Sequence, residues 1–173
     1  GVGDRFPAGD VLSVEGPVDL ARMLSQGPLV IAFHRMWCPF CQHAAIQLTD
    51  AASELERLGA AAVIVYREDV TTVAGACEGR GTKALCLSDQ HRTLEHAVGL
   101  DRFKLFRYVA FSPRRVWAAR AAGAKVGLGS NVLQGRGTYV VDRTGTVVYA
   151  HQAKTAADIA PIDDVVAAAR SAA

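Results

Sequence analysis

The chain has little that would mark a membrane protein, a disulfide scaffold or a nucleic-acid-binding protein. No apolar stretch approaches the length of a transmembrane helix, and the first residues lack the charged-then-apolar plan of a signal peptide. The 19 Lys and Arg residues and 17 Asp and Glu residues give a net charge of +2, without a long basic block, so neither nucleic acid nor a membrane surface is an expected partner. Only four cysteines occur in 173 residues, which argues against a disulfide scaffold and favours a cytoplasmic location.

The remaining composition is that of an ordinary globular domain. Half of the residues are apolar, and the length is sufficient to bury a full core. No internal repeat or linker is visible, so we expect one domain over residues 1–173. Strand-like runs alternate with helix-like segments, which predicts an α/β protein whose sheet is largely parallel at its centre. The expected strands lie in or at 9–16, 29–33, 60–66, 84–87, 138–142 and 146–150, and the expected helices at 17–26, 39–58, 70–78, 94–98 and 159–169.

The most informative motif is Trp-Cys-Pro-Phe-Cys at residues 37–41, between the apolar run 29–33 and the helix expected at 39–58. A cysteine near the first turn of a helix is favoured as a thiolate by the helix dipole and the unpaired backbone N–H groups. The second cysteine lies one helical turn further on, where it can attack a mixed disulfide or sulfenic acid on the first. The motif therefore predicts Cys38 as the nucleophile and Cys41 as the resolving thiol.

Two other interpretations of the motif stay open. A Cys-x-x-Cys pair is half of a zinc site, which His34 and His43 could complete, although Cys77 and Cys86 lack the spacing of a second half. The pair could also be buried and inert. The strand-to-helix context favours redox chemistry, so we predict no metal. Cys77 and Cys86 are expected to be free core residues, with Cys77 as a second resolving thiol in the less favoured case.

The order of elements, with two strand–helix units, a crossover, a hairpin and a last helix, is that of a thioredoxin-like fold. We expect a central mixed sheet flanked by helices, with an N-terminal strand or hairpin extension. The segment 103–122, rich in arginine and aromatic residues, is interpreted either as a lid over the site or as a helix packed on the sheet. A glycine-rich loop is expected at 123–137.

Four stretches carry a resemblance that covers nearly the whole chain: 2–7, 30–41, 86–89 and 134–145. They resemble the peroxiredoxin-like branch of the alkyl hydroperoxide reductase and thiol-specific antioxidant superfamily. Within it, the Cys-x-x-Cys and the Gln-Gly before the hairpin are similar to proteins of the prostamide/prostaglandin F synthase type. The resemblance implies reduction of a peroxide or endoperoxide O–O bond, with thioredoxin or a small thiol as external reductant and no cofactor.

The resemblance also assigns roles to two side chains. Cys38 stands where the peroxidatic cysteine would be, and Arg136 stands where an arginine would orient the peroxide. A guanidinium there would also lower the pKa of the thiol. The alternative for Arg136 is a solvated loop residue.

Departures from the two parent families bear on neighbouring positions. Peroxiredoxins have a Thr three residues before the peroxidatic cysteine and a Pro four residues earlier, where this chain has Arg35 and Ile31. Thioredoxins bury an acid at the position of Ala32 and carry a cis-proline at the position of Gly137. Arg35 is therefore predicted to replace the missing Thr beside the sulfur.

Five residues around the cysteines are candidates for binding and proton transfer. His34 and His43 could relay protons to a leaving alkoxide or thiolate, or be surface and capping residues. Trp37 is expected as an apolar wall beside the sulfur that shapes the docking surface. Pro39 and Phe40, between the cysteines, would tune the redox potential.

Three functions follow from these observations. The first is a thiol peroxidase in which Cys38 attacks an O–O bond and Cys41 closes a disulfide. The second is a thiol–disulfide oxidoreductase acting on a protein or a small molecule, including a specialised metabolite. The third is a non-catalytic binding module. A homodimer stays open for all three.

Overall fold

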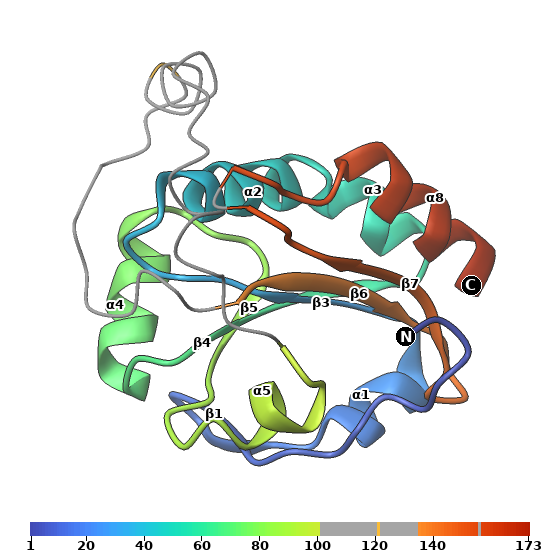
Figure 1. Ribbon diagram of the computed structural model, residues 1–173, viewed down its shortest axis with the longest axis horizontal. Coiled ribbons are helices and arrows are strands. Elements are labelled where there is room, and N and C mark those ends of the chain that lie inside the picture. Colours follow the sequence, from blue (N-terminus) through green and yellow to red (C-terminus); the bar gives the residue numbers. More distant parts are fainter. Residues whose placement is uncertain (101–120, 122–134, 156) are drawn as a thin grey trace.

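The computed structural model describes residues 1–100, 121, 135–155 and 157–173. In these residues, seven strands form one sheet in the order β2-β1-β5-β4-β3-β6-β7 (Figure 1). The strands are β1 (Val11–Ser13), β2 (Gly16–Val18), β3 (Leu29–Phe33), β4 (Ala61–Tyr66), β5 (Leu85–Ser88), β6 (Gly137–Val141) and β7 (Val147–Gln152). The helices are α1 (Leu20–Gln26), α2 (Pro39–Asp50), α3 (Ala52–Arg57), α4 (Val70–Gly79), α5 (Thr93–Ala97) and α8 (Ile162–Ala172).

The sheet is mixed, as the sequence predicts. β3, β4 and β5 run parallel at its centre, while β6 and β7 are antiparallel on one side and β1 and β2 on the other. Every residue of β3 is buried, which explains its unbroken apolar sequence, because a central parallel strand is covered on both faces. The first two strands form the expected N-terminal hairpin extension.

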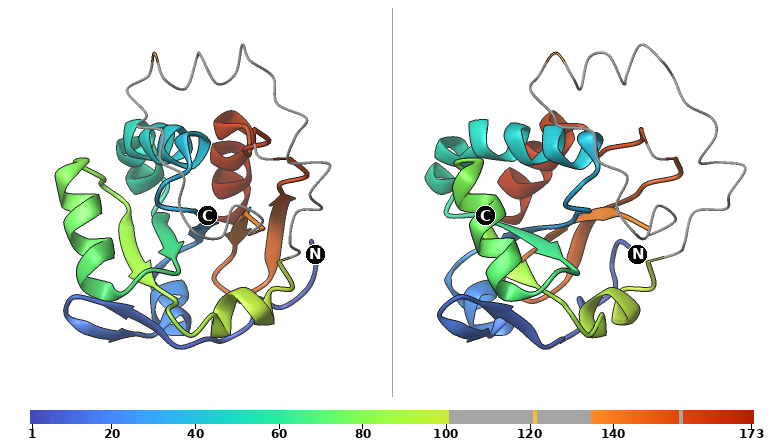
Figure 2. Two further views of the ribbon diagram at one scale, coloured as in Figure 1. Left: turned by 60° about the vertical axis from the view of Figure 1, so that its left-hand side comes forward. Right: turned by 90° about the vertical axis from the view of Figure 1, so that its left-hand side faces the viewer.

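Two layers of helices cover the two faces of the sheet (Figure 2). Helices α2, α3, α4 and α8 pack on the face to which Val30 and Ala32 contribute. The opposite face, with Ile31 and Phe33, packs against α1 and α5. Alternate residues of β3 thus serve different cores, and the cysteine motif that follows β3 leads directly into the first of these helix layers.

Three expected helices have wrong boundaries. The last helix, expected at 159–169, begins at Ile162, directly after Pro161, and runs to Ala172. Pro17 belongs to β2, and α1 begins after Asp19, whose carboxylate accepts hydrogen bonds from the backbone N–H groups of Ala21 and Arg22. The helix expected at 39–58 is divided at Ala51 into α2 and α3. No proline or glycine marks this break, so the sequence offers no local signal for it.

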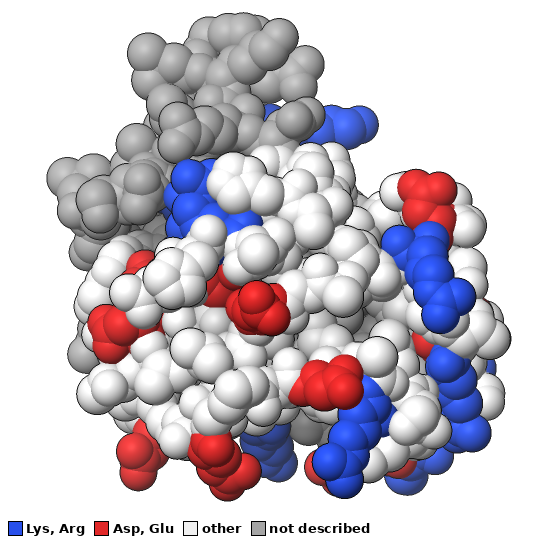
Figure 3. Space-filling model, turned by 90° about the horizontal axis from the view of Figure 1, so that it is seen from below, with Lys and Arg blue, Asp and Glu red and all other residues white. Residues whose placement is uncertain are grey.

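The segment expected at 103–122, and its proposed role as a lid, lies outside the described residues apart from Ala121, as does most of the glycine-rich loop. Within the described part of the chain, the helices are too short or too polar to cross a membrane. On the face that Figure 3 shows, acidic and basic side chains are interspersed around uncharged surface, in keeping with the small net charge.

Candidate functional site

The two cysteines of the motif lie at the start of α2. Cys38 is the N-cap residue, with φ −86° and ψ 120°, and Pro39 occupies the first helical turn, where its missing N–H costs nothing. Cys41 therefore lies one turn inward. Cys38 is 6% exposed and Cys41 only 2%, so the first sulfur is nearer to solvent than the second.

Arg136 reaches both sulfur atoms, and the sheet register explains why. Phe33 at the end of β3 pairs with Gly137 at the start of β6, so the residues flanking this pair, His34 and Arg136, leave the sheet side by side. The Arg136 Nη1 lies 3.6 Å from Cys38 Sγ and 3.3 Å from Cys41 Sγ. The Nη2 donates to the carbonyl oxygen of Thr155 at 2.8 Å. Arg136 is thus a buried guanidinium directed at the cysteines rather than a solvated loop residue.

The surroundings separate the pKa values of the two thiols. A hydrogen bond from the Cys41 thiol and the positive charge of Arg136 lower the pKa of Cys38 to about 5, with a smaller contribution from the charge of Arg35 and against the effect of burial. Burial raises the pKa of Cys41, and the neighbouring Cys38 raises it further. At neutral pH the pair is therefore a thiolate at Cys38 and a thiol at Cys41.

The two candidate histidines have different environments. His34 is 5% exposed, and burial together with the charge of Arg136 lowers its pKa to about 3, so its ring is neutral at physiological pH. Its ring packs edge-on against Tyr66 at a centroid distance of 6.4 Å. His43 is partly buried on α2 and does not line the cavity beside Cys41 that is described below.

The other predicted residues lie close to the cysteines in sequence but face different surroundings. The backbone N–H of Arg35 donates to Cys41 Sγ at 3.3 Å. Trp37 is 50% exposed and lines a surface groove between α2 and α4. Phe40 is buried in a small apolar cluster with both cysteines and Ala157, so its ring supports the site from within.

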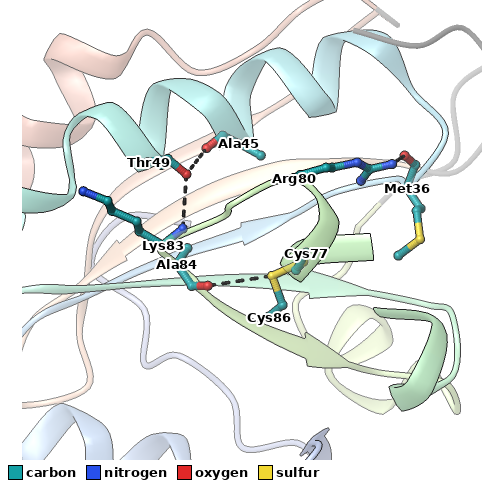
Figure 4. Close-up of a disulfide and its surroundings, with 8 residues drawn as sticks. All are labelled: Met36, Ala45, Thr49, Cys77, Arg80, Lys83, Ala84 and Cys86. Atoms are coloured by element: carbon teal, nitrogen blue, oxygen red, sulfur yellow. Dashed lines mark hydrogen bonds between the residues drawn. A yellow bond between two sulfur atoms is a disulfide. The ribbon is translucent and has the colours of Figure 1, made fainter. Parts of the chain in front are cut away.

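The expectation that Cys77 and Cys86 are free core residues is wrong, because they form a disulfide between α4 and β5 (Figure 4). Their Cα atoms are 6.7 Å apart across the α4–β5 connection. Cys77 is therefore not available as a second resolving thiol in this state. Arg80, which follows α4, also contacts the residue before the motif, since its Nη2 donates to the carbonyl oxygen of Met36 at 3.1 Å.

The sequence analysis did not identify two polar residues that lie near the cysteines. His151 on β7 and Asp158 beyond it are joined by a contact of 3.0 Å between His151 Nε2 and Asp158 Oδ1, and both line a cavity together with Cys41. The predicted hairpin register could have placed His151 on this face of the sheet. The loop conformation that brings Asp158 back to it has no sequence signal. Among the described residues, no three His, Cys, Asp or Glu side chains are grouped so as to hold a metal ion.

The sheet order, with a Cys-x-x-Cys at the start of the helix after β3, defines a thioredoxin-like protein with a cysteine site. The chain belongs to the AhpC/TSA family, whose model matches residues 2–150. No curated protein matches the sequence.

Solved peroxiredoxin structures share the fold. Peroxidoxin BcpB from Mycobacterium tuberculosis is 22% identical, with a TM-score of 0.72, and the match covers 98% of this chain and 96% of that one. Peroxiredoxin Q from Xanthomonas campestris is 20% identical, with a TM-score of 0.71 and coverage of 98% and 97%. A Xanthomonas campestris bacterioferritin comigratory protein, described for its alkyl peroxide reduction activity, is 19% identical, with a TM-score of 0.71 and coverage of 99% and 98%.

Proposed function

We propose that this protein is a thiol peroxidase that reduces the O–O bond of a peroxide or endoperoxide through Cys38. The observation that carries the proposal is the Cys38 sulfur at the N-terminus of α2, 3.6 Å from the buried Arg136 guanidinium, with its pKa lowered to about 5. A sulfur in these surroundings is a thiolate at neutral pH, and the thiolate is the nucleophilic form. Membership of the AhpC/TSA family supports this chemistry.

The proposed reaction has two steps. The Cys38 thiolate attacks one peroxide oxygen, the O–O bond breaks, and Cys38 becomes a sulfenic acid while the other oxygen leaves as an alkoxide that takes up a proton. The Cys41 thiol then attacks the sulfenic sulfur, which releases water and forms the Cys38–Cys41 disulfide. No prosthetic group is needed, because both electrons come from the two thiols.

The disulfide must then be reduced from outside. Thioredoxin or a small thiol would supply the two electrons by thiol–disulfide exchange. Trp37 precedes α2, is half exposed and lines the groove between α2 and α4. Its ring is a suitable contact for such a reductant or for an apolar substrate. The alkyl peroxide activity of the similar Xanthomonas campestris protein favours an organic hydroperoxide as substrate, and the likeness to prostamide/prostaglandin F synthase-type proteins, which would favour an endoperoxide, stays a prediction.

The other candidate residues receive roles that mutation can test. In this proposal Arg136 holds the peroxide oxygens in line, and Arg35 adds positive charge beside Cys38. Pro39 shapes the helix start and Phe40 packs beneath the sulfurs. Of the two histidines that flank the motif, His43 is the candidate for proton transfer, whereas the lowered pKa of His34 leaves it a role in positioning.

Replacing Arg35 by Ala should slow the reaction of Cys38 with a hydroperoxide by about threefold, because a positive charge near the negative charge that develops on the leaving oxygen is lost. Stopped-flow measurement of the pseudo-first-order rate at pH 7 would check this. Arg57→Ala, on the remote helix α3, is the matched control. An unchanged rate in Arg35→Ala would remove Arg35 from the site.

A second candidate function is thiol–disulfide exchange with a protein or small-molecule disulfide, including that of a specialised metabolite. A thiolate of low pKa at the start of a Cys-x-x-Cys helix suits this reaction as well. A non-catalytic binding module, the third reading of the sequence, would not need the charge that Arg136 directs at both sulfurs.

The deciding experiment adds one equivalent of a hydroperoxide to the reduced protein and follows thiol loss and intact mass on a stopped-flow timescale. We expect fast formation of an internal disulfide that disappears in Cys38→Ser. Slow peroxide reaction with ready exchange against a disulfide would favour the oxidoreductase. Inertness to both would favour the binding module.

Three wider properties are part of the proposal. Residues 1–173 would act as one domain, since strands from both ends of the chain share one sheet. A cytoplasmic location stays a prediction, and the Cys77–Cys86 bond weakens its original ground, because structural disulfides are rare in that compartment. Cell fractionation and the oligomeric state in solution test the location and the open homodimer.

A further inference from the structure

A small cavity lies beside Cys41. Its volume is about 30 Å³, which is large enough for a water molecule. The rest of its wall is apolar, and the polar residues that line it are Cys41, His34, Gln47, Arg136, Thr138, His151 and Asp158. A space of this size beside several hydrogen-bonding groups is suited to one water molecule.

The sheet register builds this cavity. Thr138 on β6 pairs with Ala32 on β3 and with His151 on β7, so the three side chains form a row on one face. Ala32 packs in the core shared with α2 and α8, which identifies this face as the one below Cys41. Because Ala32 and Thr138 are small, the row leaves space for the cavity and for the larger ring of His151.

The His151 ring is held by Asp158. His151 Nε2 lies 3.0 Å from Asp158 Oδ1, while Asp158 Oδ2 accepts a hydrogen bond of 2.7 Å from the backbone N–H of Lys154. When Nε2–H donates to the carboxylate, Nδ1 carries the lone pair and can accept a proton.

His34 supplies a second group directed at the same space. Its Nδ1 is buried and has no hydrogen-bond partner within the described part of the chain. A buried nitrogen without a partner costs free energy, and a water molecule in the cavity that His34 lines would satisfy it. The ring remains neutral, because burial and Arg136 lower its pKa to about 3, so His34 can hold a water molecule but cannot carry the proton.

The proposed reaction requires a proton acceptor at this place. Cys41 must lose its proton when it attacks the sulfenic sulfur of Cys38, and its burial disfavours the free thiolate. The other groups around Cys41 do not serve, since Arg136 and Arg35 are cationic and burial raises the pKa of the neighbouring Tyr66 hydroxyl. Cys38 is the electrophile in this step.

We propose that the His151–Asp158 pair accepts the proton of the Cys41 thiol through a water molecule in the cavity, with His34 positioning that water. This rests on the function proposed above. Cys41 loses its proton to the water, which passes one to His151 Nδ1, while the sulfur attacks Cys38 and the S–O bond breaks. The departing hydroxide takes up a proton from solvent, and His151 returns its proton to solvent. The net change is therefore one sulfenic acid and one thiol to one disulfide and one water. His151 receives the proton through the water and does not itself touch the reacting sulfur atoms.

The test separates attack by Cys38 from resolution by Cys41. In stopped flow, sulfenic acid formation depends on hydroperoxide concentration and disulfide formation does not. His151→Gln should slow the second phase by about a hundredfold at pH 7, the size expected for loss of a positioned base, and change the first phase by less than about twofold. The remaining rate should rise about tenfold per pH unit as hydroxide replaces the base.

Two variants complete the design. Asp158→Asn keeps an oxygen for the Lys154 N–H but removes the charge, and it should slow the second phase by about tenfold. His91→Gln, the same change at an exposed histidine, is the control and should leave both phases unaltered. A wild-type second phase in His151→Gln and Asp158→Asn, or equal slowing of both phases, would overturn the proposal.

A second arm keeps this result independent of peroxide reduction. An aromatic disulfide reagent loads Cys38 as a mixed disulfide, and Cys41 then displaces the second coloured thiolate, so the same proton must leave Cys41. Slow release of only the second thiolate in His151→Gln would support the proton acceptor even if peroxide does not react with Cys38. Unchanged release would overturn it.

Discussion

The chain has two cysteine pairs, and the first cysteine of each lies at the opposite end of a helix. Cys38 caps the N-terminus of α2, where the helix dipole favours a negative sulfur, and the Arg136 guanidinium lies 3.6 Å away. Cys77 lies in the last turn of α4, where the dipole disfavours a thiolate, and it is joined to Cys86 on β5. The same residue type is therefore a thiolate, and the proposed nucleophile, in one place and half of a disulfide in the other, and its surroundings decide which.

The comparison is tested most directly by replacing Cys38 in one variant and the Cys77–Cys86 pair in another. Cys38→Ser should lower the rate of hydroperoxide reduction by at least about a thousandfold, because the nucleophile is lost. The double variant Cys77→Ser/Cys86→Ser should keep the rate within about twofold. Peroxide consumption coupled to an excess of dithiol measures both, and a large loss in the double variant would show that the second pair takes part in the redox cycle.

The charge beside the first pair should account for the next largest effect. Arg136→Gln is expected to slow the attack on hydroperoxide by about a hundredfold at pH 7, because the variant loses both the positive charge and the donor that orients the oxygens. Arg136→Lys, which keeps the charge but not the planar guanidinium, should react at a rate between those of the wild type and Arg136→Gln. The measurement is the peroxide-dependent phase in stopped flow, with Arg170→Gln on the exposed surface of α8 as control. A wild-type rate in Arg136→Gln would contradict this role.

The second pair should affect stability rather than rate. Removing a disulfide between residues nine apart in sequence should lower the free energy of unfolding by about 2.5 kcal/mol, through the greater freedom of the unfolded chain. Urea unfolding of the Cys77→Ser/Cys86→Ser variant, followed by circular dichroism without added reductant, measures this. An unchanged midpoint of urea unfolding would mean that the disulfide contributes no net stability.

The pH dependence of alkylation gives the finest comparison. Because the pKa of Cys38 is lowered to about 5, its thiolate is present above that pH and is lost as the pH falls through it. The rate of alkylation by iodoacetamide should therefore change little from about pH 6.5 to 8.5 and fall by about tenfold per unit below about pH 5. Peptide mass analysis should find Cys41 unmodified at pH 6.5, since burial raises the pKa of its thiol. A midpoint near the ordinary thiol value would contradict the thiolate assignment.

Much of the fold was predictable from local sequence. The apolar run at β3, the helix that starts at Pro39 and the turn at Arg143-Thr144-Gly145 each have a strong local signature, and the structure has all three elements there. The boundaries at Pro17 and Ala51 were wrong because capping by Asp19 and the packing of α3 decide them. These are choices between local alternatives of similar energy, which tertiary contacts resolve.

The candidate site was only half predictable. The Cys-x-x-Cys spacing indicated the two thiols, and the family resemblance indicated Arg136. The register of β3 with β6 accounts for the distance of 3.6 Å between Arg136 and Cys38. His151 and Asp158 lie more than 100 residues after the motif, and the chain brings them to Cys41 only through β7 and the loop that follows it. The sequence around Cys41 contains no signal that indicates His151 or Asp158.

The sequence by itself determined the thioredoxin-like fold and the position of the Cys-x-x-Cys pair, because hydrophobic periodicity and short-range spacing are local properties. Tertiary structure alone decided the pairing of Cys77 with Cys86, the approach of Arg136 to both sulfurs and the cavity beside Cys41. Each of these depends on which strands are neighbours and in which register they pair. Such long-range contacts determine distances and burial, and through them the pKa values that separate the two thiols.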